Sequence, residues 1–319
     1  MKTVNILSIM MLTACFAACS QQPVNLDHSV KTIPASYYED ATEQGSVVKF
    51  TYQTQLPDTE EQIEKYCYVY LPYGYQENDS KRYDILYFMH GGGSTAEKFL
   101  GGNDSISLNR KTLDHMIQDK LIKPMIVVTP SFYRSDRTDT IANAGDLVKR
   151  FPEELTKALI PAVEGKFHTH AKDTTPEGLM ASRDHRAFSG FSMGSVTTWW
   201  VFHKALDYFK YFMPLSGDSW VVQQLGGSQA PEATAEALAA PLKENKKDFF
   251  IFSITGSEDM AEKSLTPQIE AMKQQPVFVM DNDFRKGNLY YSILPGGKHE
   301  SSTYGPHYIY TALPEFFKH

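Results

Sequence analysis

The sequence predicts an α/β protein built on a mainly parallel sheet of eight strands, with helices on both faces. Short runs rich in β-branched and aromatic residues alternate along the chain with stretches of helical periodicity, a pattern typical of parallel sheets. The later runs (ILYFM, MIVV and FFIFSI) are continuously apolar, as expected of strands covered on both faces. At 319 residues and 36.1 kDa, the chain is long enough for one large domain with a sizeable core.

Eight runs are expected to form the strands, at residues 47–54, 67–71, 85–89, 125–129, 187–191, 211–215, 249–255 and 289–294. The first two are joined by a loop without a helical pattern, so we expect them to form an antiparallel edge. Helices are expected at residues 153–167, 196–208 and 267–273. The first places Leu155, Leu159 and Val163 near one face. The third begins with Thr266 as its cap and Pro267 at its first position.

The composition excludes two broad classes of protein. Lysine and arginine total 31 and aspartate and glutamate total 38, which leaves a formal net charge of −7. A general nucleic-acid binder needs a basic face, so no nucleic-acid partner is expected. Hydrophobic residues make up 42% and charged residues 22% of the chain, a balance that excludes long disordered regions.

The N-terminus has the outline of a secretory signal. One lysine precedes an apolar stretch from Val4 to Leu12, and small residues follow. Two tetrapeptides, which end at Cys15 and Cys19, resemble the lipobox of bacterial lipoproteins. Cys19 is the preferred lipidation site because it leaves the more usual apolar length; Cys15 and a plain cleaved signal are the alternatives. We therefore expect export through the inner membrane and a lipid anchor in the bacterial envelope.

The expected organisation is a signal peptide over residues 1–19, a polar tether over residues 20–42 and one domain over residues 43–319. No internal repeat or Pro-rich linker divides the last of these. Once the signal is removed, Cys67 has no partner, so no disulfide framework is expected.

The strongest chemical signal is the G-x-S-x-G run at residues 190–194, with Ser192 at its centre. It lies between an expected strand and an expected helix, which is the setting of a nucleophile elbow in the α/β-hydrolase fold. The turn is so tight that the residues two before and two after the serine must be small. The helix N-terminus behind Ser192 also favours developing negative charge. The alternative is an ordinary strand-to-helix turn.

A serine hydroxyl needs a base, and the base needs an orienting carboxylate. In this fold the order along the chain is Ser, Asp or Glu, then His. Of the histidines late in the chain, His299 lies in a Gly-rich loop directly after the last strand and is the predicted base. Asp259, after the strand at 249–255, is the predicted acid. Asp218 and Glu258 are the alternatives, and all three could simply form turns.

An oxyanion hole is expected at the His90-Gly91-Gly92-Gly93-Ser94 loop, which follows the strand at 85–89. Glycines let the main chain approach a substrate carbonyl without a Cβ in the way. The predicted donors are the backbone N–H groups of Gly91 or Gly92 and of Met193. The loop lacks the Lys-Ser/Thr of a phosphate-binding loop, and the chain has no G-x-G-x-x-G, so no cofactor is predicted.

No metal site is predicted either. The His168-Thr169-His170 pair has no further ligands at zinc spacing, and the Asp281-Asn282-Asp283 run lacks the glycine and glutamate of a calcium loop.

With these motifs in place, the chain resembles carbohydrate esterase family 1, among the esterase D-like α/β hydrolases. It resembles in particular the feruloyl esterase domains attached to bacterial xylanases. The resemblance is carried in register by YVYLPYGYQ, DILYFMHGGGS, KPMIVVTPSFY, SRDHRAFSGFSMGS, LDYFKYFMPLSGDSW, ITGSEDMAEKSLTPQIEAM and ILPGGKHESSTYGPHYIYTALPEFF. It implies Ser192 as nucleophile, Asp259 as acid and His299 as base. Family members often have an aromatic residue soon after the catalytic histidine, whereas here residues 300–303 precede Tyr304.

The candidate cleft aromatics are Trp220, Phe132, Tyr133 and Tyr304, each of which could instead be structural. The function that the resemblance implies is a serine esterase that removes feruloyl or acetyl groups from xylan-type polysaccharide through an acyl-enzyme. The alternatives are an acyltransferase, a siderophore-ester or thiol-ester hydrolase on the same scaffold, and a non-catalytic glycan-binding lipoprotein.

Overall fold

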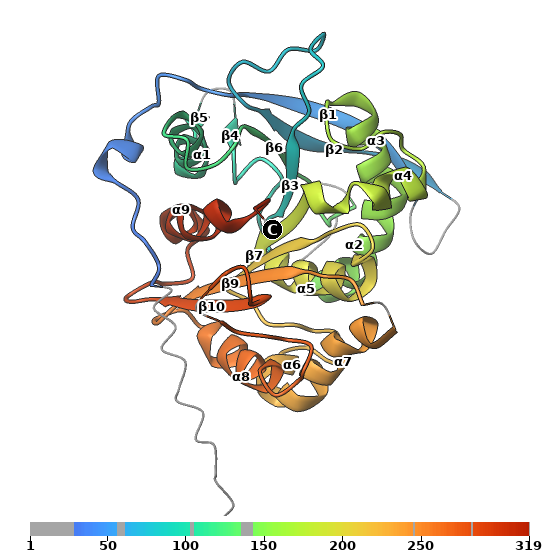
Figure 1. Cartoon of the computed structure of the whole chain (residues 1–319), viewed down its shortest axis with the longest axis vertical. Coiled ribbons are helices and arrows are strands. Elements are labelled where there is room, and N and C mark those ends of the chain that lie inside the picture. The colour runs from blue at the N-terminus through green and yellow to red at the C-terminus, as the bar shows by residue number, and fades with distance from the viewer. Residues whose placement is uncertain are drawn as a thin grey trace, which may run out of the picture.

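An eight-stranded mixed sheet forms the centre of the molecule. The computed structural model describes residues 29–55, 61–102, 105–134, 143–244, 246–281 and 283–318 (Figure 1). The strands lie in the order β1 (Ser46–Gln55), β2 (Gln62–Leu71), β6 (Met125–Thr129), β3 (Asp84–Met89), β7 (Arg186–Phe191), β8 (Tyr211–Leu215), β9 (Phe250–Gly256) and β10 (Leu289–Leu294). β1 pairs antiparallel with β2 and β2 with β6, and the remaining neighbours are parallel. The predicted sheet and its antiparallel edge are therefore confirmed.

Helices cover both faces of the sheet (Figure 1). One face carries α2 (Ala144–Glu154), a π-helical turn (Leu155–Leu159), α3 (Ile160–Lys166), α5 (Met193–Ala205), α7 (Pro231–Glu244) and α8 (Glu262–Met272). The other carries α1 (Leu108–Gln118), α9 (Ser301–Ala312) and a 3₁₀ turn (Ala35–Tyr38). The shorter elements are α4 (Pro176–Ala181), α6 (Gly226–Gln229), the 3₁₀ turns Arg183–His185 and Leu313–Glu315, and a hairpin of β4 (Gly101–Gly102) with β5 (Ser105–Ile106).

Two hydrophobic cores follow from this layering. Successive side chains of a strand point to opposite faces. In β3, Ile85, Tyr87 and Met89 join the core on the α5 side, while Leu86 and Phe88 join the core on the α1 side. All six residues of β3 are buried. The continuous apolar runs are thus strands with both faces covered, as the sequence predicts.

The parallel register aligns the carboxyl ends of the central strands. Gly190 in β7 lies opposite Met89 in β3, and Leu215 in β8 pairs with both of its neighbouring strands. The loops that follow these strands therefore open at one edge of the sheet. In open α/β sheets this is the edge at which ligands bind.

Some predicted boundaries were wrong. β2 begins at Gln62, five residues before the predicted start, because its polar first half pairs with β1 along the whole ladder. The predicted helix at 153–167 is the second part of a helical segment that begins at Ala144 and contains a π-helical turn. The helix predicted to begin at Pro267 begins at Glu262, with the proline inside it. A turn closed by the Asp259 carbonyl, which accepts the Glu262 N–H, starts this helix early.

The expected tether was wrong over its described part, residues 29–42. Val30, Ile33 and Tyr37 are buried against α1 and α9. The Lys31 N–H donates to Thr311 Oγ1 at 2.9 Å, and the Tyr37 ring stacks on His115 at 4.4 Å. The packed domain therefore begins near residue 30. Cys15, Cys19, the expected signal and the first part of the tether lie outside the described residues. No helix in the described part of the chain combines the length and the apolar character that crossing a membrane requires.

Candidate active site

Ser192 lies in the sharp turn between β7 and α5. Its backbone has φ 58° and ψ −116°, a conformation that non-glycine residues rarely adopt and that marks stored strain. The Ser192 N–H donates to the Leu215 carbonyl at 2.9 Å, and its own carbonyl accepts the Val196 N–H at 3.0 Å. Strand pairing on one side and the first helical bond on the other hold the strained residue in place.

The two glycines of the motif are required by close backbone approach. A Cβ on Gly190 would lie 2.4 Å from the Gly194 carbonyl oxygen, and a Cβ on Gly194 would lie 2.1 Å from the Met89 carbonyl oxygen. Neither separation is sterically allowed for backbone atoms. The motif is therefore a true elbow and not an ordinary turn.

The structure brings the three predicted catalytic side chains into one hydrogen-bonded chain. His299 Nε2 lies 2.9 Å from Ser192 Oγ, and His299 Nδ1 lies 2.7 Å from Asp259 Oδ1. The carboxylate accepts from Nδ1–H, which leaves Nε2 as the acceptor for the serine proton. The Asp259 side chain is fully buried, whereas the His299 ring is 27% exposed. This arrangement can activate a hydroxyl on the open side of the site.

Two adjacent loops position the acid and the base. The loop after β9 and the loop after β10 are joined by the Ser257 N–H, which donates to the Leu294 carbonyl, and by the Glu258 N–H, which donates to the Gly297 carbonyl. Gly296 has φ +71° and its N–H donates to Ser257 Oγ at 2.8 Å. Asp259 Oδ1 also accepts the Ala261 N–H at 2.8 Å. Cross-bonded backbone therefore fixes the Asp259–His299 contact.

The two alternative acids have other surroundings. Asp218 is buried and binds the Gly227 N–H at 2.9 Å and the Ser264 hydroxyl at 3.1 Å, so it joins α6 to α8. Burial raises the pKa of its carboxyl above the usual value. Glu258 is exposed and lies 3.9 Å from Lys298. In the described part of the chain, neither carboxylate forms a hydrogen bond with His299.

The predicted oxyanion loop lies beside the nucleophile. A Cβ on Gly91 would lie 3.3 Å from Ser192 Cβ and 3.9 Å from its Oγ, so the main chain at Gly91 borders the reacting hydroxyl. Gly92 follows in a turn closed by the Ser94 N–H, which donates to the Gly91 carbonyl. Met193 is the first residue of α5, and a first-turn N–H has no acceptor within its helix. The main chain at Gly91 and the first N–H of α5, that of Met193, therefore both lie next to Ser192.

His90 holds this loop from behind. Its Nδ1 contacts the Gly91 carbonyl at 2.8 Å, and its Nε2 contacts Ser131 Oγ at 2.8 Å. Burial lowers the pKa of His90 to about 4, so the ring is neutral at physiological pH. A carbonyl only accepts, so Nδ1–H donates to Gly91 and Nε2 accepts from Ser131.

Ser131 and Tyr133 also support the oxyanion loop, and Ser131 belongs to no motif that sequence reasoning could recognise. Ser131 lies two residues after β6; its carbonyl accepts from Lys65 Nζ at 2.8 Å, and its hydroxyl accepts the Tyr133 N–H at 3.1 Å. The Tyr133 hydroxyl accepts the Gly93 N–H at 2.8 Å. That bond occupies the Gly93 amide, so the predicted oxyanion donors remain the N–H groups of Gly91 or Gly92 and of Met193.

The candidate cleft aromatics have different surroundings. Tyr133 is half-buried and stacks near His90, with ring centroids 5.5 Å apart. Phe132 is buried in the core behind it. Trp220 is half-buried and its Nε1 donates to Asp218 at 3.3 Å. Tyr304 packs against the α1-side core from α9. Tyr133 is therefore the member of this set tied to the oxyanion loop.

The comparisons with known proteins agree with this geometry. Residues 62–309 match the family described as "Putative esterase". Over 288 residues, 89% of its length, the chain is 43% identical to endo-1,4-beta-xylanase Y of Acetivibrio thermocellus. It spans only 24% of that relative.

Two solved structures match this chain over nearly their whole length. The feruloyl esterase module from Clostridium thermocellum, solved as a serine-to-alanine mutant complexed with sinapinate, is 41% identical with a TM-score of 0.79; the match covers 91% of this chain and 94% of that one. A ferulic acid esterase of the anaerobic fungus Anaeromyces mucronatus is 17% identical with a TM-score of 0.62, covering 92% and 98% of the two chains. The fungal likeness shows a shared fold. The chain therefore belongs to the esterase family and is a serine carboxylic-ester hydrolase with the α/β-hydrolase fold.

Proposed function

We propose that this esterase removes feruloyl groups from xylan-type plant polysaccharide. The observation that carries the proposal is the 41% identity, over 94% of its length, to a feruloyl esterase module whose structure holds sinapinate, a close chemical relative of ferulate. The curated relative, of which the chain spans about a quarter, is a xylanase, which supports a polysaccharide as the alcohol part of the ester.

In the proposed acylation step, His299 Nε2 takes the proton from the Ser192 hydroxyl while Ser192 Oγ forms a bond to the ester carbonyl carbon. The carbonyl oxygen becomes an oxyanion held by the N–H groups of Met193 and of Gly91 or Gly92. Asp259 stabilises the imidazolium. Collapse of the tetrahedral intermediate breaks the bond to the sugar oxygen, which leaves as an alcohol after it takes the proton from His299.

Deacylation repeats the sequence with water. His299 removes a proton from the water as it attacks the acyl-serine carbonyl, and the same donors hold the second oxyanion. Collapse releases the free acid and returns the proton to Ser192 Oγ. The exposed edge of the imidazole lets water enter once the sugar has left.

The test is the identity of the acid released from native arabinoxylan, measured by mass spectrometry. Wild type should release ferulate, and Ser192→Ala should release none while it keeps the wild-type circular dichroism spectrum. Release of acetate without ferulate would contradict the feruloyl assignment. Wild-type turnover in Ser192→Ala would contradict the mechanism.

We propose further that the chain is exported and lipid-anchored at Cys19, on the basis of the apolar stretch and lipobox-like tetrapeptide in its first 19 residues. The test is partition into detergent phase after expression in a bacterium. Cys19→Ser should move the protein to the aqueous phase, whereas Cys15→Ser should not. The opposite outcome would assign the lipid to Cys15, and aqueous partition of wild type would contradict the anchor.

A further inference from the structure

Three potential metal ligands lie together at the amino ends of the central strands, at the opposite end of these strands from the catalytic site. Asp84 is the first residue of β3, His185 ends the 3₁₀ turn that leads into β7, and His170 lies in the loop after α3. The catalytic serine lies at the other, carboxyl end of β7. The ester mechanism uses none of these three side chains.

Backbone contacts hold the three segments side by side. β3 and β7 are parallel neighbours in which Ile85 pairs with Arg186, so Asp84 and His185 are adjacent across the two strands. Tyr83 forms a bridge with Thr169, and its N–H donates to the His168 carbonyl at 3.0 Å. The loop with His170 is therefore fixed against the start of β3.

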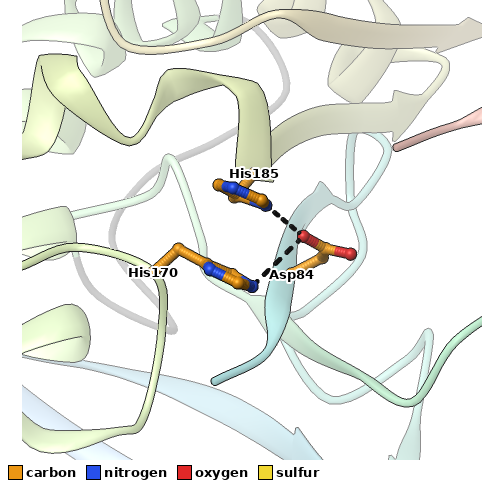
Figure 2. Close-up of side chains that lie close together, drawn as sticks. All are labelled: Asp84, His170 and His185. Carbon is orange, nitrogen blue, oxygen red and sulfur yellow. Dashed lines mark hydrogen bonds and ion pairs between the residues drawn. The ribbon is translucent and has the colours of Figure 1, made fainter. Parts of the chain in front are cut away.

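The side chains converge on one carboxylate oxygen (Figure 2). Asp84 Oδ1 lies 2.6 Å from His185 Nδ1 and 3.7 Å from His170 Nε2. The three ligand atoms all lie within 4.8 Å of one another. The imidazole rings stack with centroids 3.6 Å apart. Sequence spacing does not predict this cluster, because Asp84 lies far from both histidines along the chain and comes close to them only where β3 and β7 pair.

The cluster is accessible. The Asp84 side chain is 9% exposed, whereas those of His170 and His185 are 33% and 44% exposed. They line an open cavity of about 500 Å³ together with Lys81, Arg82, Lys123 and Asp184. The Asp84 carboxylate is buried, but the two imidazoles border the open cavity. A metal ion held by these three side chains would therefore have room for water as a further ligand.

We propose that Asp84, His170 and His185 bind a divalent transition-metal ion such as zinc, with solvent in the remaining coordination positions. Two imidazole nitrogens and one carboxylate oxygen are ligands that zinc takes readily, and magnesium and calcium prefer all-oxygen sites. The ion would join the amino ends of β3 and β7 to the loop after α3. Its role is structural, since the triad lies at the opposite edge.

Binding requires small side-chain movements. Tetrahedral zinc with bonds of about 2.0–2.1 Å separates its ligand atoms by about 3.3–3.5 Å. The His185–Asp84 contact of 2.6 Å must therefore open to admit the metal, and the His170–Asp84 contact of 3.7 Å must close slightly. The stacked rings must also tilt toward a common point. Both rings are partly exposed, so they can rotate without displacing the backbone.

The charges around the cluster act in both directions. Burial, His185, Arg82 and Lys123 lower the pKa of His170, against the opposite effect of Asp84. This favours the neutral imidazole that a metal needs. The same cations repel a dication, while Asp184 on the cavity wall attracts it.

The test is calorimetric titration of zinc into the untagged, EDTA-treated protein at pH 7.5. We expect one zinc per chain at this site. His170→Gln and His185→Gln should each weaken the affinity by at least tenfold, while His168→Gln, a matched change in the same loop, should leave it unchanged. Magnesium chloride should produce no binding heat. Zinc affinity that is equal in wild type and in both ligand variants, or no uptake by wild type, would overturn the site.

Thermal unfolding gives a second readout. At a hundredfold excess of zinc over its dissociation constant, the Tm of wild type should rise by about 5 °C, and that of His170→Gln should not respond. The rate of p-nitrophenyl acetate hydrolysis should be the same with zinc and with EDTA. Loss of this activity in EDTA would overturn the structural role.

Discussion

Asp259 differs from the carboxylates near it in the sequence because one of its oxygens binds the catalytic imidazole. That contact holds the Nδ1–H tautomer of His299 and stabilises the imidazolium that forms during attack. Asp259→Asn should therefore lower kcat by roughly 10⁴-fold with little change in KM. Glu258→Gln, an exposed neighbour, should retain wild-type kcat with p-nitrophenyl acetate. Equal losses in the two variants would contradict the assignment of Asp259.

Ser131 does not touch the reacting atoms; it is a positioning residue that acts through His90. Its hydroxyl donates to His90, which in turn holds the Gly91 carbonyl. Ser131→Ala should lower kcat about tenfold with KM unchanged, because an oxyanion donor that shifts acts mainly on the transition state. Ser131→Thr, which keeps the hydroxyl, should recover most of the activity. A rise in KM alone would indicate a role in substrate binding instead.

The sequence predicts the residues of the triad, but it does not predict the residues that support them. Ser192, Asp259 and His299 each follow a recognisable strand, and their order along the chain is a property of the fold. The role of Ser131 depends on β6 lying beside β3, a long-range pairing that a local pattern cannot specify. Trp220 and Tyr304 were proposed from residue type alone, and type does not determine which face an aromatic ring occupies.

At the scale of elements, the junction of β7 and α5 depends on close backbone contacts. A Cβ on Gly194 would lie 2.1 Å from a β3 carbonyl oxygen, so Gly194→Ala must push α5 away from the sheet. Overpacking of this kind costs about 1–3 kcal/mol or more. Gly74 has a positive φ of 76° but open space where a Cβ would lie, so Gly74→Ala should cost about 1–2 kcal/mol from the left-handed backbone alone. Urea unfolding of both variants measures the difference; a smaller loss in Gly194→Ala than in Gly74→Ala would contradict this packing.

Strands were easier to predict than helices for a physical reason. Strands buried on both faces need apolar side chains at every position, and runs such as 85–89 show this directly. Helix α9 contains Gly305 and Pro306, which are poor helix formers, so its sequence suggests a loop. Its burial against α1 and the sheet stabilises it despite that propensity. Val30, Ile33 and Tyr37 are likewise stabilised by tertiary packing. Because the residues around them are polar, the sequence pattern predicts a tether there and not a packed segment.

At the scale of the whole molecule, His90 links folding to pH. Burial lowers its pKa from 6.5 to about 4 in the folded state. Between these values the unfolded chain binds a proton that the folded chain does not, so stability present above pH 6.5 is lost as the pH falls toward 4. From pH 7 to pH 5 the contribution of His90 should be about 2 kcal/mol.

His90→Gln should remove that contribution. Denaturant unfolding at pH 7 and pH 5 gives the loss of stability for each protein, and wild type should lose about 2 kcal/mol more than the variant. The comparison cancels the effect of the other histidines, which titrate in both proteins. An identical loss in the two proteins would contradict a neutral, buried His90.

The proposed mechanism requires an ester bond between the acyl group of the substrate and Ser192 Oγ. We would incubate the protein with methyl ferulate, quench with acid within the first turnovers and map the acylated peptide by mass spectrometry. The prediction is one feruloyl group on the Ser192 peptide of wild type, and none in Ser192→Ala. A feruloyl group on a different residue, or ferulate release without any acylated Ser192, would contradict nucleophilic catalysis at the β7–α5 elbow.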